Sequence, residues 1–534
     1  MTHPCVVTLD RKSAPRVLFA GNRLIEVDLP AGTRVIYPKA PLEGLRDPDA
    51  AIRYAINHPY NREPLYALLR PGMKVVIAMD DISLPLPPMK RPDVRERVLT
   101  IVLQLLADHG VDDFEMIIAT SVHRKMTGPE VRHIVGDRIF DAYWPRRLYN
   151  RDAEDRDNMA FVGETDLGER VVLNKKAVEA DLVIYVNLNL VPMDGGHKSV
   201  AVGLCGYESL KPHHNPKVMR KCHSYMDPKT SELNTVVERM GKVTNKTLKV
   251  FTIETTVNNR MFDRPLSFLH KNEDDWSGNE RLAFKGMQFA LDRTPSEARQ
   301  KIFEKVPAPF ELTGVFAGET EAAHAHTLKR CFEQYAVPVE GQCDILVSGI
   351  PYVSPYNVNA FLNPLLVQVM AQGYLFNMYR GHPLVKKGGT VIITHPCTDR
   401  FDHAQHAPYV EFVHRLLPET RDAMELHKRF EHEFAAHPAY LQMYRRGNAY
   451  HPVHAFFMWY WGEAGRQHVG RVIVVGADNA YIPQVLGYET AKSMHEALEM
   501  AKDTAPPSPQ ITCMHLPPIV MADMMVPRSP GAAT

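Results

Sequence analysis

The sequence lacks the features of a secreted, membrane-bound or nucleic-acid-binding protein. It has no run of about 18 apolar residues and no apolar stretch behind a basic N-terminus, so no membrane span or secretory leader is predicted. The 62 lysines and arginines balance 62 aspartates and glutamates, which leaves no basic field to attract nucleic acid or an anionic membrane. We therefore expect a cytoplasmic location, with no nucleic-acid or membrane partner.

Cysteine is also scarce and unpaired in the sequence. Seven cysteines are scattered over 534 residues without a CxxC pair, which argues against a disulfide framework or a thiolate zinc site. Histidine is abundant instead, with 25 residues, and most of these are expected on the surface or packed in the interior. His395, His403 and His406 follow a predicted strand but lack the carboxylates of a typical metal site.

Apolar patterning predicts an α/β fold. Strand-like and helix-like segments alternate along the chain, which is typical of largely parallel sheets covered by helices. Residues 16–19 and 22–27 alternate as a β-hairpin does, and a helix is predicted to open at Thr127. Further strands are predicted at residues 74–79, 114–120, 182–190, 344–348, 390–394 and 471–475, and helices at 94–107, 361–379, within 406–437 and at 490–502.

This pattern predicts two α/β domains with a cleft between them. The N-terminal domain, residues 1–315, is expected to carry the chemistry and contains a charged, turn-rich insertion or lid at about residues 262–312. Residues 316–505 form the predicted C-terminal α/β domain. Residues 506–534 are a Pro- and Ala-rich tail, expected to be poorly ordered at its end.

The first candidate segment for chemistry, residues 117–127, is a predicted strand that delivers His123 to its carboxyl end, just before a helix. Ligands in open α/β sheets bind at that end, and a histidine there can act as a base near neutral pH. The alternative is a structural histidine that caps the helix or contacts a carbonyl group.

The second candidate segment follows the predicted strand at residues 182–190. Lys198 lies behind Gly195 and Gly196, where no Cβ atom restricts the approach of a ligand. A lysine in this position is either a phosphate partner or a nucleophilic attachment point, although the spacing differs from that of a P-loop. Sixteen residues further on lies the pair His213 and His214, and neutral imidazole is a ligand of nickel, copper or zinc.

Together with a third segment, residues 314–324, these motifs resemble the lactate racemase family. Five segments match the family's motifs in order, at residues 119–127, 180–184, 195–198, 214 and 316–324. Enzymes of that family carry a nickel-pincer nucleotide attached covalently to a lysine. By itself, the third segment is expected to be only the end of a strand and the start of a helix.

The resemblance implies an isomerase that inverts a secondary-alcohol carbon of a hydroxy acid or a sugar-like substrate by abstracting and returning a hydride. It implies that His123 is the acid/base, that Lys198 is a catalytic residue and holds the cofactor, and that His214 binds nickel. The partners it implies are a small hydroxy substrate and cofactor-synthesis proteins. The remaining candidate cofactor-binding residues are Asp81, Ser83, Gly195, Gly196 and His197.

The sequence departs from the family pattern where substrate is bound. Leu188 replaces a second catalytic histidine, and Leu84 replaces an arginine that binds the substrate carboxylate. Residues 356–361 lack the family's glutamine and lysine, and their Asn357 and Asn359 are expected to bind hydroxyl groups instead. We therefore expect a sugar, a sugar acid or an aromatic hydroxy acid in place of lactate, with His197 or an asparagine-bound water at the opposite face.

Two alternatives remain open at this point. The first is a pincer-bearing oxidoreductase that uses one base. The second is a degenerate homologue that binds a nucleotide or metal without catalysis.

Overall fold

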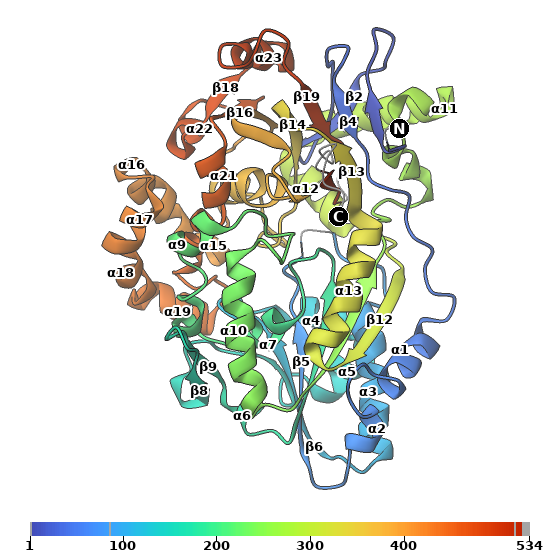
Figure 1. Cartoon of the computed structure of the whole chain (residues 1–534), viewed down its shortest axis with the longest axis vertical. Coiled ribbons are helices and arrows are strands. Elements are labelled where there is room, and N and C mark those ends of the chain that lie inside the picture. The colour runs from blue at the N-terminus through green and yellow to red at the C-terminus, as the bar shows by residue number, and fades with distance from the viewer. Residues whose placement is uncertain (1–2, 85–86, 517–518, 526–534) are drawn as a thin grey trace, which may run out of the picture.

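A computed structural model of the chain describes residues 3–84, 87–516 and 519–525. Two main β-sheets, flanked by helices, lie one below the other in Figure 1. Both sheets are largely parallel, which confirms the predicted fold class. The proposed cleft between two domains stays a prediction. No helix in the described part of the chain is long and apolar enough to span a membrane.

The first sheet has six strands in the order β12-β11-β10-β5-β6-β7, and only β12 runs antiparallel to its neighbour. The central strands β5 and β10 are apolar and buried, as expected for strands covered on both faces. The strands are β5 (Lys74–Asp80), β6 (Asp113–Ala119), β7 (Leu148–Asn150), β10 (Leu182–Asn189), β11 (Val250–Val257) and β12 (Leu312–Gly318).

Helices cover this sheet, and one of them begins at Thr127 as predicted. The side chain of Asp93 caps the first helix of the set, and Thr127 forms a capping box with Glu130 at the next. The main helices of this half are α1 (Pro48–Asn57), α3 (Val94–Asp108), α4 (Gly128–Val135), α5 (Asp137–Tyr143), α7 (His197–Gly203), α8 (Tyr207–Leu210), α9 (Pro216–Lys221), α10 (Glu232–Thr247) and α13 (Thr320–Tyr335).

The second sheet has nine strands and combines both ends of the chain. Strands from residues 6–36 pair with strands from residues 343–351 and 511–514, so the N-terminal segment contributes to a sheet built mainly from the C-terminal half. The predicted domain boundaries stay a prediction. The strands are β1 (Val6–Thr8), β2 (Arg16–Gly21), β3 (Leu24–Val27), β4 (Arg34–Ile36), β14 (Cys343–Pro351), β16 (Val385–Thr394), β17 (Arg471–Val475), β18 (Glu489–Ala491) and β19 (Ile511–Met514).

The segment predicted as an insertion is helical and packs on the hairpin β2-β3. It contains the short turns η2 (Arg264–His270) and η3 (Glu273–Asp275) and the helices α11 (Gly278–Arg293) and α12 (Ser296–Lys305). Its apolar side chains, among them Phe268, Trp276 and Phe284, form one cluster with Val17 and Phe19 of the hairpin.

The C-terminal half adds a group of mostly short helices. Its most buried member, α20 (His454–Trp461), has no exposed face. The helix predicted at residues 361–379 is shorter, with α14 (Pro364–Gln368) followed by the π-helical η4 (Val369–Leu375). The others include α15 (His403–Glu411), α17 (Ala423–Leu426), α18 (His432–Ala435), α19 (Pro438–Arg446), α21 (Glu463–His468), α22 (Tyr481–Leu486) and α23 (Met494–Lys502).

The tail contributes ordered strands before its end. Besides β19, it forms β20 (Met521–Met525), which lies between β13 (Ala336–Glu340) and β15 (Tyr379–Arg380) in a small parallel sheet. The disorder predicted for the end of the tail concerns residues 526–534, which lie outside the described residues.

Candidate functional site

A pocket of about 110 Å³ lies where β5, β6 and β10 reach their carboxyl ends. Because these strands are parallel, the loops that follow them meet at one edge of the first sheet. The pocket brings together Asp81, Ser83, His123, Gly195 and Lys198 among the predicted site residues, and adds Asp80, Leu84, Tyr185, Asn187, Leu188, Asp194 and Ser199.

His123 is held by a carboxylate. Its Nδ1 lies 2.9 Å from Oδ2 of Asp81. The same carboxylate accepts the backbone N–H of Ser83 with Oδ1 and the Ser83 hydroxyl with Oδ2. Burial alone would raise the pKa of Asp81, but the His123 ring and the Ser83 hydrogen bonds outweigh burial and hold that pKa below its usual value. With Nδ1–H donated to this carboxylate, Nε2 of the neutral ring is free to accept a proton.

The pKa of the preceding residue, Asp80, is shifted in the opposite direction. Its Oδ2 accepts the backbone N–H of Leu188 at 2.8 Å, and its Oδ1 lies 3.3 Å from the hydroxyl of Tyr185. Loss of water around this carboxyl raises the pKa of Asp80 to about 8. Asp80 was missed by sequence reasoning, although two adjacent aspartates at the end of an apolar strand are a readable signal of a polar site.

Lys198 lies in the first turn of α7, at the rim of the pocket. Its Nζ donates to the carbonyl oxygen of Met193 at 3.1 Å and lies 3.8 Å from Oδ1 of Asp194. The other carboxylate oxygen of Asp194 accepts the backbone N–H groups of Leu190 and Val191, which fixes the loop after β10. The amine therefore has one nearby counter-ion and stays partly exposed to the pocket.

The turn before Lys198 is clamped by a buried ion pair. Gly195 and Gly196 have φ values of +84° and +60°, which favour glycine. Glu254 of β11 accepts the backbone N–H of Gly196 at 2.6 Å and binds Nδ1 of His324 at 3.0 Å. Burial disfavours the charged His324 ring, but Glu254 outweighs burial and raises the pKa of His324 above its usual value. The third sequence segment thus positions the lysine loop.

His197 points away from the pocket. Its Nε2 lies 2.9 Å from a carboxylate oxygen of Glu321, and its ring packs against Gly241 of α10. The ring is 7% exposed and does not line the pocket with Lys198. Because the side chain of His197 is enclosed under α10, this geometry does not support its predicted contact with a cofactor. It also does not support a role for His197 as the acid/base at the opposite face of the substrate.

His214 lies outside the pocket, in the loop after α8. Its Nδ1 is 2.6 Å from Nδ1 of His213, so one of these two atoms carries the shared proton. Burial lowers the pKa of His213 to about 3 and that of His214 well below its usual value, so both rings are neutral. When His214 donates its Nδ1–H to His213, its Nε2 has a free lone pair for a metal ion.

No cluster of three or more His, Cys, Asp or Glu side chains suited to a metal ion occurs within residues 3–84, 87–516 and 519–525. His395 lines a different cavity, and Nε2 of His406 contacts the carbonyl oxygen of Tyr356. His214, with its neutral imidazole, is the metal ligand that the family resemblance implies.

An aromatic wall from the C-terminal half faces His123. The rings of Tyr356 and His454 have their centroids 5.3 Å from that of His123, and Tyr450 lies slightly farther away. Nδ1 of His454 binds the hydroxyl of Tyr409 at 2.5 Å. Sequence reasoning missed this wall, because α20 and its preceding loop lie far along the chain from His123 and carry no recognisable motif.

Comparison with known proteins shows a partial similarity to lactate racemases. Residues 20–226 match the lactate racemase N-terminal domain. Lactate racemase of Lactiplantibacillus plantarum is 25% identical over 170 residues, which are 31% of this chain and 38% of that enzyme. Lactate racemase of Thermoanaerobacterium thermosaccharolyticum is 22% identical over 251 residues, which are 45% of this chain and 53% of that enzyme. Over residues 20–226 the chain is therefore similar to the lactate racemase family.

The solved structure of lactate racemase apoprotein from Thermoanaerobacterium thermosaccharolyticum shares the fold. It aligns with a TM-score of 0.60 at 18% sequence identity, over 95% of this chain and all of that one. The sequence matches are shorter, and the aligned segments span only 38% and 53% of the two curated lactate racemases. Similarity to lactate racemases is therefore shown for part of the chain, whereas activity and substrate are matters for proposal.

The divergence from lactate racemases has a structural counterpart beside Leu84. Leu84 lines both the Lys198 pocket and a neighbouring, mainly apolar cavity of about 360 Å³. The apolar side chains around that cavity are those of Ile82, Leu84, Pro87, Pro88, Met89, Pro129, Ile134, Pro307, Tyr352, Val353 and Val358.

The amides expected to bind substrate hydroxyls are engaged elsewhere. Asn357 accepts the backbone N–H of Ser354 at 2.6 Å and donates to the carbonyl oxygens of Tyr352 and Ala360. Asn359 donates to Glu130 at 2.7 Å. These contacts shape the loop around residue 357, so the expectation of free amides at this place is not supported.

Proposed function

We propose that the chain is a racemase or epimerase that inverts the secondary-alcohol carbon of a hydroxy compound, with a nickel-pincer nucleotide attached to Lys198. One observation carries the proposal. In a chain similar to lactate racemases, the carboxylate-held His123 and the amine of Lys198 face one pocket at the carboxyl edge of the first sheet. A base and an attachment point are thus within reach of one small molecule.

The residues present fit such a cofactor. Lys198 offers a partly exposed amine at the rim of the pocket, and His214 offers a neutral imidazole whose Nδ1 is paired with Nδ1 of His213. A single protein imidazole suits a metal that arrives with its other donor atoms in place. The chemistry such a group supplies when bound is reversible uptake of the carbinol hydrogen as a hydride.

The protein's own part is to move the hydroxyl proton. His123 accepts that proton at Nε2 while the carbinol carbon becomes a carbonyl carbon, and it returns the proton after the hydrogen is delivered to the other face. Asp81 stabilises the protonated ring and keeps its orientation through Nδ1. No net oxidation of the substrate results.

The substrate we propose is a hydroxy acid or related alcohol with an apolar or aromatic substituent. Leu84 offers no cation to a small carboxylate, and the 360 Å³ cavity beyond it is large enough for a phenyl-sized group. The engaged amides of Asn357 and Asn359 make a polyhydroxylated substrate less favourable than an apolar one.

The test uses protein produced together with cofactor-synthesis proteins and a substrate with deuterium on its carbinol carbon. Phenyllactate, lactate, malate and a sugar acid are compared by chiral chromatography and mass spectrometry. We expect inversion of phenyllactate with retention of deuterium, and a loss of about 100- to 10,000-fold in kcat for His123→Asn. Absence of inversion for all four compounds in protein that carries the adduct would refute the proposal.

The covalent link is tested separately by intact mass. Lys198→Ala is expected to lose the cofactor adduct and keep its fold, whereas Lys246→Ala, an exposed lysine on α10, retains the adduct. An adduct of unchanged mass in Lys198→Ala contradicts the assignment of the attachment site.

A one-base oxidoreductase is the second candidate, and one observation favours it. Among the described residues that line the Lys198 pocket, His123 is the only histidine, and Leu188 lies where the family has its second. An enzyme of this kind would release the ketone, pass the hydride to a second, carbonyl-containing substrate, and leave the configuration of the remaining alcohol unchanged. Product analysis in the deuterium experiment separates the two candidates.

A further inference from the structure

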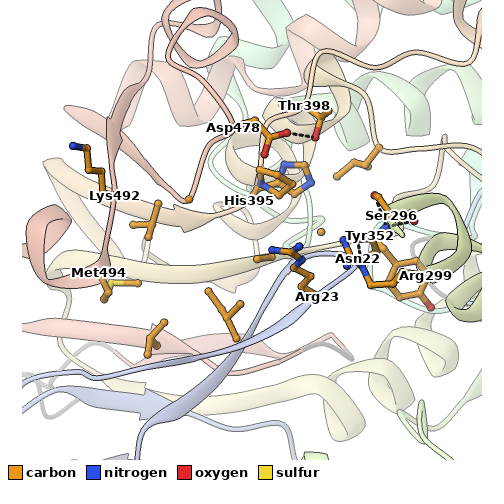
Figure 2. A pocket seen from close by; sticks show the side chains of 18 of the residues that line it. Asn22, Arg23, Ser296, Arg299, Tyr352, His395, Thr398, Asp478, Lys492 and Met494 are labelled. Atoms are coloured by element: carbon orange, nitrogen blue, oxygen red, sulfur yellow. Dashed lines mark hydrogen bonds between the residues drawn. The ribbon is translucent and has the colours of Figure 1, made fainter. Parts of the chain in front are cut away.

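A second, larger cavity lies at the carboxyl edge of the second sheet (Figure 2). It measures about 690 Å³ and opens where β14, β16 and β17 end. Among the residues that the structure describes, none lines both this cavity and the Lys198 pocket. The ends of parallel strands are the usual place for small-molecule ligands, and this volume is large enough for a sugar phosphate or a nucleotide.

A buried cation faces this cavity. Arg299 of α12 is 5% exposed and donates to the side chain of Asn22 and to the carbonyl oxygens of Leu291 and Thr294. It forms no ion pair with any carboxylate in the described part of the chain. Burial lowers the pKa of Arg299, and the neighbouring Arg23 cation lowers it further. An anion between these two arginines would relieve both effects.

Two helices begin at the same cavity. The first residue of α12, Ser296, lines it, and the N-cap residue of this helix, Pro295, provides no side-chain acceptor for the first turn. The N-terminus of α23, at Met494, also lines the cavity. The terminus of α12 places partial positive charge towards an anion, whereas the side chain of Ser493 already caps α23.

Neutral donors and acceptors lie next to the cations. Nδ1 of His395 accepts the backbone N–H of Cys397 at 2.9 Å, so Nε2 of the neutral ring carries the proton and donates. Burial lowers the pKa of His395 to about 3, which keeps the ring neutral. Asp478, after β17, accepts the hydroxyl of Thr398 with Oδ2 and has a second oxygen available for a ligand hydroxyl.

Figure 2 shows how these groups are arranged. Arg23, Arg299 and Ser296 lie at one part of the cavity, Thr398 and Asp478 at another, and His395 between them. Glu26 is paired with Lys285, whereas Asp292, 3.9 Å from Arg23, and Glu297 offset part of the positive charge at the first part. The cavity thus has an anion-binding part and a hydroxyl-binding part.

We propose that this cavity binds a phosphate monoester that carries hydroxyl groups, such as a sugar phosphate or a mononucleotide. The phosphate contacts Arg299, Arg23 and the first turn of α12, and the hydroxyls bind Asp478 and His395. The site is independent of the proposed racemase chemistry, and the two proposals are tested separately.

Binding is measured by isothermal titration calorimetry on the full-length chain. Glucose 6-phosphate and AMP separate the two sources of the phosphate, and glucose, adenosine and inorganic phosphate are the matched controls. We expect at least one phosphate ester to bind at least about tenfold more tightly than its unphosphorylated partner and than inorganic phosphate. Binding of neither ester, or equal binding of inorganic phosphate, overturns the proposal.

Variants locate the ligand. Arg23 is half exposed and has only a long contact of 3.9 Å to Asp292, so Arg23→Gln keeps the fold and is expected to weaken binding about tenfold. Asp478→Asn is expected to reduce the preference for esters over inorganic phosphate. Arg53→Gln, an exposed arginine on α1, is the matched control and binds as the wild type does. Unchanged affinity in Arg23→Gln overturns the assignment.

One further variant separates the two pockets. Lys198→Ala leaves ester binding unchanged if the ligand occupies the second sheet. A loss of binding in Lys198→Ala places the ligand in the first pocket and refutes the proposal, while the racemase proposal is judged by its own adduct and deuterium measurements.

Discussion

The residues Asp80 and Asp81 are neighbours in the sequence, yet their surroundings give them different charges. Asp81 receives two hydrogen bonds from Ser83 and faces the His123 ring, so it stays ionised. Asp80 has a pKa of about 8 because it is removed from water and lies beside Asp81 and Asp194. Neighbouring carboxyl groups whose pKa values are shifted in opposite directions are typical of sites that transfer protons. The pair therefore strengthens the assignment of His123 as the base.

At Leu84, one side chain is expected to decide between substrates. Leu84→Arg restores a guanidinium that can bind a carboxylate bidentately, so we expect kcat/KM for lactate to rise by about tenfold or more relative to phenyllactate. The exposed Leu282→Arg on α11 controls for the added charge and should leave the ratio unchanged. If lactate gains nothing, the argument from the missing cation is wrong.

His213 and His214 are expected to differ in their effect on nickel. His214→Ala removes the candidate ligand and should abolish tight retention of nickel, measured by elemental analysis after gel filtration. His213→Ala removes only the partner that orients the ring, so we expect a loss of about 10- to 100-fold in nickel affinity. Equal nickel content in wild type and His214→Ala would exclude His214 as the ligand.

Among the elements, the turn between β10 and α7 depends on glycine. A Cβ atom at residue 196 would lie 2.8 Å from the His324 ring, and the φ of +60° disfavours any other residue. Gly196→Ala is therefore expected to destabilise the protein by about 1–3 kcal/mol. It should also lower adduct formation at Lys198, because the loop shifts.

The control for this substitution is Gly286→Ala in the exposed interior of α11, where nothing lies within 4 Å of the new methyl group. Alanine is the better helix former, so this variant should gain about 0.5–1 kcal/mol. Chemical denaturation measures both changes. Stability of Gly196→Ala equal to that of the wild type would contradict the proposed clamp by Glu254 and His324.

The elements that carry the site were predictable because their signals are local. Apolar runs marked β5, β6 and β10, and the polar residues just behind them marked the pocket edge. The helix α20 was not predictable in this way. Its residues are all buried and show no polar face, and its contacts with His214 through Phe457 and Trp461 join segments that are far apart in the sequence. Contacts of this range depend on the packing of the whole chain.

In the whole molecule, distant segments close the second sheet. The hairpin at residues 16–27 was predicted correctly, but its pairing with β14 was not, since local alternation carries no information about a partner strand in the other half of the chain. Likewise, Glu254 lies inside an apolar strand, where a single charged residue signals a polar contact but does not name His324 as its partner.

One buried carboxylate ties three such segments together. Glu273 of η3 accepts the backbone N–H of Val17, the guanidinium of Arg16 and the hydroxyl of Tyr37, and it lies 2.8 Å from Nε2 of His515. Burial would raise the pKa of Glu273, but these partners, His515 foremost, lower it to about 2 from an ordinary value of 4.5. The N-terminal segment, the insertion and the tail are thus joined by their contacts with one ionised carboxylate.

This charge predicts how the stability of the molecule depends on pH. Because the pKa of Glu273 is lower in the folded than in the unfolded chain, its stabilising contribution is complete above about pH 4.5 and is lost as the pH falls towards 2. Glu273→Gln removes one partner of a buried ion pair, so it is expected to cost about 3–5 kcal/mol at pH 7 and to flatten the decline below pH 4.5. The exposed Glu43→Gln should leave the curve unchanged. The measurement is the denaturation midpoint from pH 7 to 2. If the midpoint of Glu273→Gln fell with pH as steeply as that of the wild type, the three segments would be held by other contacts.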